Sequence, residues 1–429
     1  MNINNTIIYG FLFLFMFLIG SCTQKKDASS INVIPVASTV GNYSVLNLSD
    51  YATEIRYIPL ETNDAALISP INLQIIYENE KILVKDNSST GSNCYMFDHT
   101  GKFCRKIGQR GQGPDDYLEI DISMFDNFIY LLDRLKVLVY DINGRLVENI
   151  NLKSDLISEE YRQANYKIIP MKKDKFVMTV ATYFGYYPFA FLFETRNSKV
   201  INIKEYPSSV KLDKLGRGNY SSPELGNMYR YKDEVRVYKA INDTIFSIDN
   251  NADLKEAFII DLGKYGPTLS YFEGKEFVGD VRDPVQWSAQ VRNNFKKYIF
   301  LNYIDESLNH LFFKFSFGNF APEPFEFTAP LGDKATNFNV YSVYNKRTGE
   351  LTLMRQPIKG KFGFKNDIDN GPIIFPHYLS SNNELVTFIQ PDEFLEYYGN
   401  IQKPSAALKE IAGKTGIYDN PIVIVAKLK

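Results

Sequence analysis

The chain has 429 residues, a formal net charge of -2 and a hydrophobic fraction of 45%. A near-neutral chain lacks the basic footprint of a nucleic-acid-binding protein, and this apolar fraction is that of a folded rather than a disordered chain. The length exceeds that of a typical single-core domain, so it requires a repetitive architecture or two domains. The chain is rich in Phe (32) and Tyr (29), which favour β-strands.

The beginning of the chain has the pattern of a secretory signal. Residues Ile7 to Gly20 carry no charge. The run is too short to span a bilayer, which takes about 20 apolar residues, but it has the length of a signal-peptide core. The segment Leu18 to Cys22 (Leu-Ile-Gly-Ser-Cys) resembles the bacterial lipobox, although Met1 to Thr6 contains no Lys or Arg. An uncleaved anchor and a chance apolar start are the alternatives.

This resemblance implies that residues 1–21 are a lipoprotein signal peptide and that Cys22 is lipidated. Residues 22–42 are polar and then mixed, and we expect them to form a flexible tether. Thr23 does not provide the Asp-type signal for retention in the inner membrane, which favours an outer membrane lipoprotein facing the periplasm or the surface.

From about Tyr43 to about Tyr398, short apolar runs alternate with turns rich in Asn, Asp and Gly. This spacing is typical of many short antiparallel strands. A degenerate repeat joins a strand to a turn at residues 82–102 and again at 129–145, with a period of about 45 residues, as in propellers. Weaker copies lie at residues 192–197, 244–251 and 343–350.

The repeats predict an all-β fold, a six-bladed β-propeller of four-stranded antiparallel blades with long inter-blade loops, over residues 43–400. A sixth blade would use Glu384 to Ile389 and be closed by an N-terminal strand near Ile55 to Leu60. We interpret residues 206–233 and 262–298 as insertions, the second with a helix near 285–298. Residues 401–429 are expected to be a C-terminal extension packed on the propeller, with a helix at 404–415 and a strand at 422–425.

One motif supports a family assignment. Ile107 to Tyr117 (Ile-Gly-Gln-Arg-Gly-Gln-Gly-Pro-Asp-Asp-Tyr) resembles a signature of six-bladed β-propeller lipoproteins common in Bacteroidetes, although that family often has Glu where this chain has Asp116. Further matches to the family lie at 58–62, 242–246 and 364–372, the last with Asn370 where Gly is common. The resemblance covers about residues 43–400 and implies the fold, but the family is largely uncharacterised and implies no activity.

The same motif contains the first candidate binding residues. Arg110, Asp115 and Asp116 could face the mouth of the propeller channel. The glycine spacing is neither that of a dinucleotide loop nor that of a Walker loop. The alternative is that the glycines permit positive φ in a tight inter-blade turn.

Two further loops are candidate ligand-binding sites. Tyr186 and Tyr187 belong to an aromatic loop that could stack on sugars or pack between blades. Asp367 and Asp369 lie at alternate positions, as calcium ligands do, but Gly371 stands where a third ligand belongs, and an Asx turn is the alternative.

Asp86 and Asp133 end equivalent strands of the repeat. If those strands are innermost, both carboxylates approach the central channel and could bind a cation or perform acid–base chemistry. The alternative is that each caps a local turn. Cys94 and Cys104 flank a hairpin turn and should lie nearly opposite each other, as a disulfide or as two packed thiols.

No catalytic constellation is evident in the sequence. His99, His310 and His377 are scattered without zinc-site spacing. We therefore expect a binding or scaffold module for a glycan or protein partner, with no cofactor unless calcium binds and no nucleic-acid partner. The alternative is a metal-dependent hydrolase or lyase of the lactonase-like propeller type.

Overall fold

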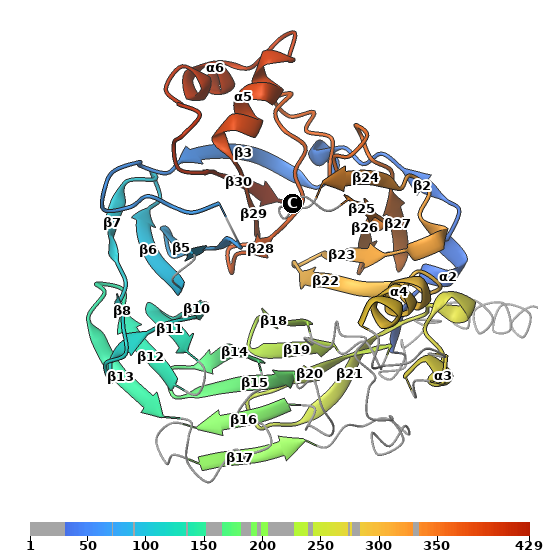
Figure 1. Cartoon of the computed structure of the whole chain (residues 1–429), viewed down its shortest axis with the longest axis horizontal. Helices are drawn as coiled ribbons and strands as arrows, with labels where there is room; N and C mark the ends of the chain where they lie inside the picture. Colours follow the sequence, from blue (N-terminus) through green and yellow to red (C-terminus); the bar gives the residue numbers. More distant parts are fainter. Residues whose placement is uncertain are drawn as a thin grey trace, which may run out of the picture.

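The structure is a computed structural model, and the part of the chain that it describes consists of residues 31–70, 72–88, 91–133, 136–151, 165–181, 190–194, 199–204, 227–238, 243–272, 275–276, 284–328 and 334–429. Six antiparallel sheets surround a central axis and form a six-bladed β-propeller (Figure 1). The predicted fold class is therefore confirmed.

The blades follow one another along the chain. Blade 1 consists of β4 (Gln74–Glu78), β5 (Lys81–Ser88), β6 (Gly91–Asp98) and β7 (Phe103–Lys106). Blade 2 consists of β10 (Asp121–Phe125), β11 (Phe128–Asp133), β12 (Lys136–Asp141) and β13 (Leu146–Asn151). Blade 3 consists of β14 (Asn165–Lys172), β15 (Lys175–Ala181), β16 (Ala190–Glu194) and β17 (Lys199–Lys204). Blade 4 consists of β18 (Asn227–Tyr231), β19 (Glu234–Tyr238), β20 (Thr244–Ile248) and β21 (Leu254–Ile260).

Blade 5 consists of β22 (Phe300–Glu306), β23 (His310–Ser316), β26 (Asn339–Asn345) and β27 (Glu350–Met354), with the hairpin of β24 (Phe325–Thr328) and β25 (Lys334–Asn337) inserted after β23. Blade 6 consists of β28 (Tyr378–Leu379), β29 (Glu384–Ile389), β30 (Ile422–Leu428) and β3 (Ala52–Pro59). The insertion expected at residues 206–233 therefore contains the innermost strand of blade 4.

Blade 6 closes the ring with strands from both ends of the fold. The N-terminal strand β3 pairs antiparallel with β30, with Tyr57 opposite Ile424, and the two strands lie side by side in Figure 1. The expected closure by an N-terminal strand is thus present. The boundary expected at residue 400 does not coincide with a structural boundary, because the buried apolar run from Ile422 makes β30 the third strand of the last blade.

The segment before β3 runs along the outer edges of blades 4 and 5. β1 (Asn32–Ile34) pairs in parallel with β21, and β2 (Tyr43–Ser44) pairs in parallel with β27. The short helix α2 (Val36–Thr39) lies between them. Residues 32–39 were expected in the tether at 22–42. They are structured because Ile34 and Val36 are fully buried in the apolar core.

The helices lie outside the blades. α5 (Pro391–Gly399) and α6 (Ala406–Ala412) connect β29 to β30, and α4 (Pro284–Phe295) and α3 (Leu269–Phe272) precede blade 5 (Figure 1). Short 3-10 turns are η1 (Leu48–Asp50), η5 (Gly263–Tyr265) and η6 (Gly318–Phe320). Both predicted helices are present. Among the described residues, no helix is long and apolar enough to cross a membrane.

The sequence repeat corresponds to the turn between the third and fourth strands of a blade. The Asp98 carboxylate accepts hydrogen bonds from the backbone of Thr100 (2.8 Å) and Lys102 (3.1 Å), and Gly101 takes φ +87°. Asp141, Asp249 and Asn345 hold the equivalent turns of blades 2, 4 and 5 in the same way. A short side-chain acceptor followed by a residue with positive φ is the signature of such turns.

Cys94 and Cys104 were expected to lie nearly opposite each other, and in the structure they do not. A β-bulge between Met96 and Phe97 shifts the register of β6 against β7. Cys94 lies opposite Ile107, whose backbone donates to the Cys94 carbonyl, and both thiols are free.

Candidate functional site

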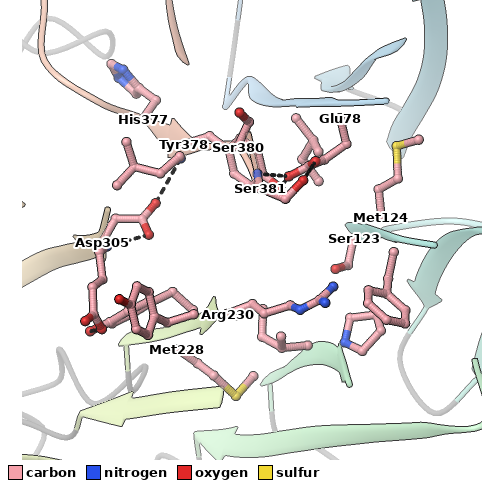
Figure 2. A pocket seen from close by; sticks show the side chains of 18 of the residues that line it. Glu78, Ser123, Met124, Met228, Arg230, Asp305, His377, Tyr378, Ser380 and Ser381 are labelled. Carbon is pink, nitrogen blue, oxygen red and sulfur yellow. Dashed lines mark hydrogen bonds between the residues drawn. The ribbon is translucent and has the colours of Figure 1, made fainter. Parts of the chain in front are cut away.

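The first strands of all six blades enclose a central cavity of about 660 Å³. Its wall consists of residues from β4, β10, β14, β18, β22 and β28 and from the turns that follow several of these strands. Figure 2 shows side chains converging on this space from different blades. A concave space of this size with convergent polar groups is the usual form of a ligand site.

Tight turns form one mouth of the cavity. Asn79 and Glu80, and likewise Asp126 and Asn127, have positive φ in two-residue turns that follow β4 and β10. Such turns suit the twist of paired strands, and Asn and Asp tolerate this conformation. Asn79 donates a 3.1 Å hydrogen bond to Asn127. Neighbouring blades are therefore fastened together at the rim.

Glu78, at the end of β4, is buried and accepts three hydrogen bonds. Its carboxylate accepts hydrogen bonds from the Tyr378 hydroxyl (2.7 Å) and the Ser381 backbone (2.7 Å), and also from the Ser381 hydroxyl. Figure 2 shows the contact between Glu78 and Ser381. Glu78 therefore joins blade 1 to blade 6, and its charge is balanced by donors rather than by a cation.

Asp305, on β22, is only 8% exposed. Its carboxylate accepts hydrogen bonds from the Leu379 backbone (3.0 Å), the Glu306 backbone (2.8 Å) and the Tyr303 hydroxyl (3.3 Å). Burial raises the pKa of Asp305 to about 7, because the ionised form is poorly solvated there. This carboxyl group therefore changes its charge near neutral pH.

The neighbouring Glu306 has two cationic partners. It accepts hydrogen bonds from Lys346 at 2.8 Å, Arg236 at 3.2 Å and the Tyr229 hydroxyl at 3.2 Å. Tyr231 lies under both cations, 4.1 Å from the Lys346 nitrogen and 5.2 Å from the Arg236 guanidinium carbon. The charge of Glu306 is thus neutralised inside the wall.

The opposite wall carries a cation. Arg230, on β18, stacks on the Phe125 ring with its guanidinium carbon 3.8 Å from the ring centre. Its Nε donates a 2.9 Å hydrogen bond to the Lys232 carbonyl. Burial lowers the pKa of Arg230, and the carboxylate of Glu78 opposes that effect. Figure 2 shows the guanidinium in the cavity, reaching toward Ser123.

Carboxylates and cationic or hydroxyl donors thus lie on different sides of the cavity, which we name the acidic half and the donor half. The acidic half comprises Glu78, Asp305 and Glu306, with Tyr378 and Ser381 between them, from blades 5, 6 and 1. The donor half comprises Ser123, Lys167 and Arg230, from blades 2, 3 and 4. Exposed Asp126 and Asp233 lie at the rim near Arg230.

The candidate residues of the glycine-rich motif lie between blades 1 and 2 and do not line the cavity. Asp115 accepts a 2.8 Å hydrogen bond from Asn149, and Asp116 accepts one of 2.9 Å from the Gly113 backbone. Arg110 belongs to β8 (Gln109–Arg110), which pairs in parallel with β9 (Asp116–Tyr117). The motif therefore forms an inter-blade connection, and a ligand role for these residues stays a prediction.

Asp367 and Asp369, the carboxylates of the motif at residues 364–372, form hydrogen bonds with residues near the start of the fold. Asp367 accepts hydrogen bonds from the backbone (2.9 Å) and hydroxyl (2.6 Å) of Ser49, and Asp369 accepts them from Tyr57 (3.1 Å) and the Gly371 backbone (2.9 Å). Neither residue lines the cavity. Tyr186 and Tyr187 lie outside the described residues, as does Cys22.

Asp86 and Asp133 could approach the channel only from innermost strands, and the structure does not meet that condition. They belong to β5 and β11, the second strands of their blades. Asp86 accepts hydrogen bonds from the Ser69 backbone (2.7 Å) and from Asn93 (2.9 Å), its cross-strand partner on β6. Asp133 lies 3.9 Å from the Lys136 nitrogen.

The three histidines do not cluster in the structure. His99 lies in an exposed turn, His310 packs edge-on against Tyr51, and His377 lines the cavity. Among the described residues, no three His, Cys, Asp or Glu side chains are placed to hold a metal ion. Sequence reasoning missed Glu78, Arg230 and Asp305; the available signal was a charged residue near the end of each strand that precedes a tight turn.

Comparison with known proteins agrees with this architecture. The family described as "Domain of unknown function (DUF4934)" matches residues 31–427. The chain belongs to this family. The match covers both β1 and β30, so the DUF4934 unit includes the closing strands of the propeller. No curated protein matches the chain.

Solved structures resemble this member of the DUF4934 family at low identity. A Bacteroides fragilis protein, named as exported by inference, has 18% identity and a TM-score of 0.61, over 93% of this chain and 100% of that one. A DUF4221 family member from Bacteroides vulgatus has 13% identity and a TM-score of 0.48, over 88% and 97%. Virginiamycin B lyase from Staphylococcus aureus has 10% identity and a TM-score of 0.34, over 71% and 89%. At 18% identity, the first similarity is one of fold alone.

Proposed function

We propose that this protein is a lipid-anchored binding or scaffold module of the cell envelope, which takes a glycan or a segment of a protein partner into its central cavity. The cavity itself carries the proposal, because it is lined by polar side chains from all six blades. Glu78, Asp305 and Glu306 are each held by several donors from their surroundings. Such rigid, pre-paired walls suit recognition.

The signal pattern at residues 7–22 supports export and lipidation at Cys22, and Thr23, which is not an Asp-type retention signal, favours the outer membrane. Growth with an alkyne-labelled fatty acid should label the wild-type protein and leave a Cys22→Ala variant unlabelled. Labelling of both proteins would overturn the anchor at Cys22.

The alternative, a metal-dependent hydrolase or lyase, has no ligand set within the described part of the chain. Calcium at Asp367 and Asp369 stays a separate proposal. Both residues already accept hydrogen bonds from the chain, so we expect calcium and a chelator to leave the melting temperature unchanged. A rise with calcium alone would support a metal site.

The proposed function is tested by blocking the cavity. Binding to the native state raises the melting temperature by mass action, so the purified protein is screened against neutral and acidic oligosaccharides and short peptides. Met228→Trp places a bulky ring in the cavity wall, and Tyr418→Trp places the same ring at a position that is 87% exposed. We expect shifts with the wild type and Tyr418→Trp that Met228→Trp abolishes. A shift that survives in folded Met228→Trp would overturn the central site.

A further inference from the structure

The guanidinium of Arg230 is held in place before any ligand arrives. The Phe125 ring supports its face at 3.8 Å, and the Lys232 carbonyl accepts from its Nε at 2.9 Å. An Arg side chain restrained on two sides loses little conformational entropy when it binds a partner. Its two terminal nitrogens are the groups that can donate hydrogen bonds to a ligand.

Those terminal nitrogens have no hydrogen-bond or ion-pair partner in the described part of the chain. The nearest buried carboxylate, Glu78, is already occupied by Tyr378 and Ser381. Asp126 and Asp233 are exposed at the rim, where water screens their charge. Within the described part of the chain, the terminal nitrogens of Arg230 are thus available to a ligand acceptor.

Two other donors line the same half of the cavity. The Ser123 hydroxyl, 9% exposed on β10, and the Lys167 ammonium, on β14, make no side-chain hydrogen bond within the described residues. Lys167 acts only electrostatically, on Asp121. Ser123 and Arg230 thus face one region of the cavity (Figure 2), whereas Lys167 interacts with Asp121 at the other end of β10 and adds positive charge at longer range. An anionic oxygen group suits the Ser123 and Arg230 donors.

The acidic half limits how much negative charge the ligand can carry. Glu78 and Asp305 lie across the same cavity, and their ionised forms repel every additional negative charge on a ligand. A carboxylate carries one charge and matches the two-nitrogen fork of an Arg. A phosphate dianion carries twice that charge, and this geometry disfavours it.

The acidic half also selects the remainder of the ligand. Its carboxylates and the nearby hydroxyls of Ser380 and Ser381 can accept further hydrogen bonds, since each carboxylate oxygen has more than one acceptor position. A ligand with several hydroxyl donors opposite its carboxylate satisfies both halves at once. An acidic sugar has this arrangement, whereas a peptide backbone supplies fewer donors.

We propose that the central cavity binds an acidic sugar, with its carboxylate held by the Arg230 fork and assisted by the Ser123 hydroxyl, and with its hydroxyls directed at the acidic half. This inference rests on the proposed function, because it places the ligand in the same cavity.

The test compares ligands that differ only in the carboxylate. Calorimetric titration of the purified protein uses a trisaccharide that carries a single galacturonic acid residue, the neutral trisaccharide in which galactose replaces that residue, an acidic peptide and inorganic phosphate. The variants are Arg230→Gln, Arg230→Lys and, as a control, Lys409→Gln, which removes an exposed cation on α6, away from the cavity lining.

We expect the acidic trisaccharide to bind at least about tenfold more tightly than the neutral one. Arg230→Gln should remove that preference, and Arg230→Lys should retain part of it. Lys409→Gln should change little. If Arg230→Gln fails to fold, Arg230→Lys still tests the fork, because it keeps the charge and loses the paired geometry.

Two results would overturn the inference while leaving the proposed function intact. One is equal binding of both trisaccharides, unaffected by Arg230→Gln but blocked by Met228→Trp. The other is Arg230-dependent binding of the peptide or of phosphate without binding of the acidic sugar. No binding of any probe, together with no effect of Met228→Trp in the wider screen, would overturn both proposals.

Discussion

The Tyr57 hydroxyl donates a 3.1 Å hydrogen bond to Asp369 and accepts one of 3.0 Å from Asn366. Tyr57 belongs to β3, the strand that closes blade 6, whereas Asp369 and Asn366 lie in the loop before β28. Burial and the Asp369 charge raise the pKa of Tyr57. A carboxylate that the sequence marks as a candidate metal ligand thus stabilises the closure of the ring.

Replacing Tyr57 with Phe removes both hydrogen bonds and keeps the ring. We expect the free energy of unfolding to fall by about 1–3 kcal/mol, because Asp369 and Asn366 each lose a partner in a partly buried site. Urea unfolding measures the change. Tyr418→Phe is the control, since Tyr418 is 87% exposed, and equal stability of the two variants would contradict the closing role of Tyr57.

The second prediction concerns β30. Ile424 is 1% exposed and Ile417 is 54% exposed, although both belong to the last part of the chain. Ile424→Ala should lower the free energy of unfolding by about 2–5 kcal/mol, the usual cost of this truncation in a core. Ile417→Ala should change it by less than about 0.5 kcal/mol. If both variants unfold at the wild-type urea concentration, residues 401–429 are an appendage rather than part of blade 6.

The architecture could be predicted from local signals. Asp98 and Gly101, and again Asp141 and Gly144, mark the same turn in successive blades, and turn chemistry of this kind is readable in sequence. The sequence did not show which position each strand takes within its blade. Asp86 ends a strand with a clear apolar pattern, but that pattern does not say whether the strand is first or second from the axis.

The site could not be predicted because its innermost strands are the least regular in sequence. Asn227 to Tyr231 reads Asn-Met-Tyr-Arg-Tyr, without a continuous apolar run, since one face lines a polar cavity. It was therefore interpreted as part of an insertion. The partners of Glu78 come from blade 6, almost at the other end of the fold, and no local pattern encodes that contact.

The third prediction compares two equivalent turn glycines. Gly101 and Gly144 both have positive φ, so Ala is unfavourable at either position by about 1 kcal/mol. A Cβ on Gly101 would lie 2.1 Å from the Pro59 carbonyl oxygen, whereas on Gly144 the nearest atom, at 2.7 Å, belongs to the flexible Arg105 side chain.

Gly101→Ala should therefore lower the urea midpoint clearly more than Gly144→Ala. The Pro59 backbone belongs to β3 and cannot move without disturbing ring closure. Gly399→Ala serves as the reference, because a Cβ there meets nothing within 4 Å. Equal losses at Gly101 and Gly144 would mean that backbone conformation alone sets the cost.

The fourth prediction concerns the thiols. Cys94 is buried, and burial raises the pKa of its thiol, whereas Cys104 is partly exposed. Thiolate and access both govern alkylation, so iodoacetamide should label Cys104 in the native protein and Cys94 only after unfolding. Peptide mass spectrometry distinguishes the two sites. Protection of both cysteines that is lifted by a reductant would instead demonstrate a disulfide.

The last prediction concerns pH. Burial raises the pKa of Asp305 from 3.8 to about 7, so between these values the folded protein holds a proton that the unfolded chain releases. Wild-type stability should therefore fall relative to Asp305→Asn as the pH rises from 4.5 to 7, by about 1.4 kcal/mol per pH unit at most. Urea unfolding of both proteins at several pH values measures this difference. Asp233→Asn, at the exposed rim, controls for the loss of one negative charge near the cavity. A difference between wild type and Asp305→Asn that is constant with pH would show that Asp305 is already ionised at pH 4.5.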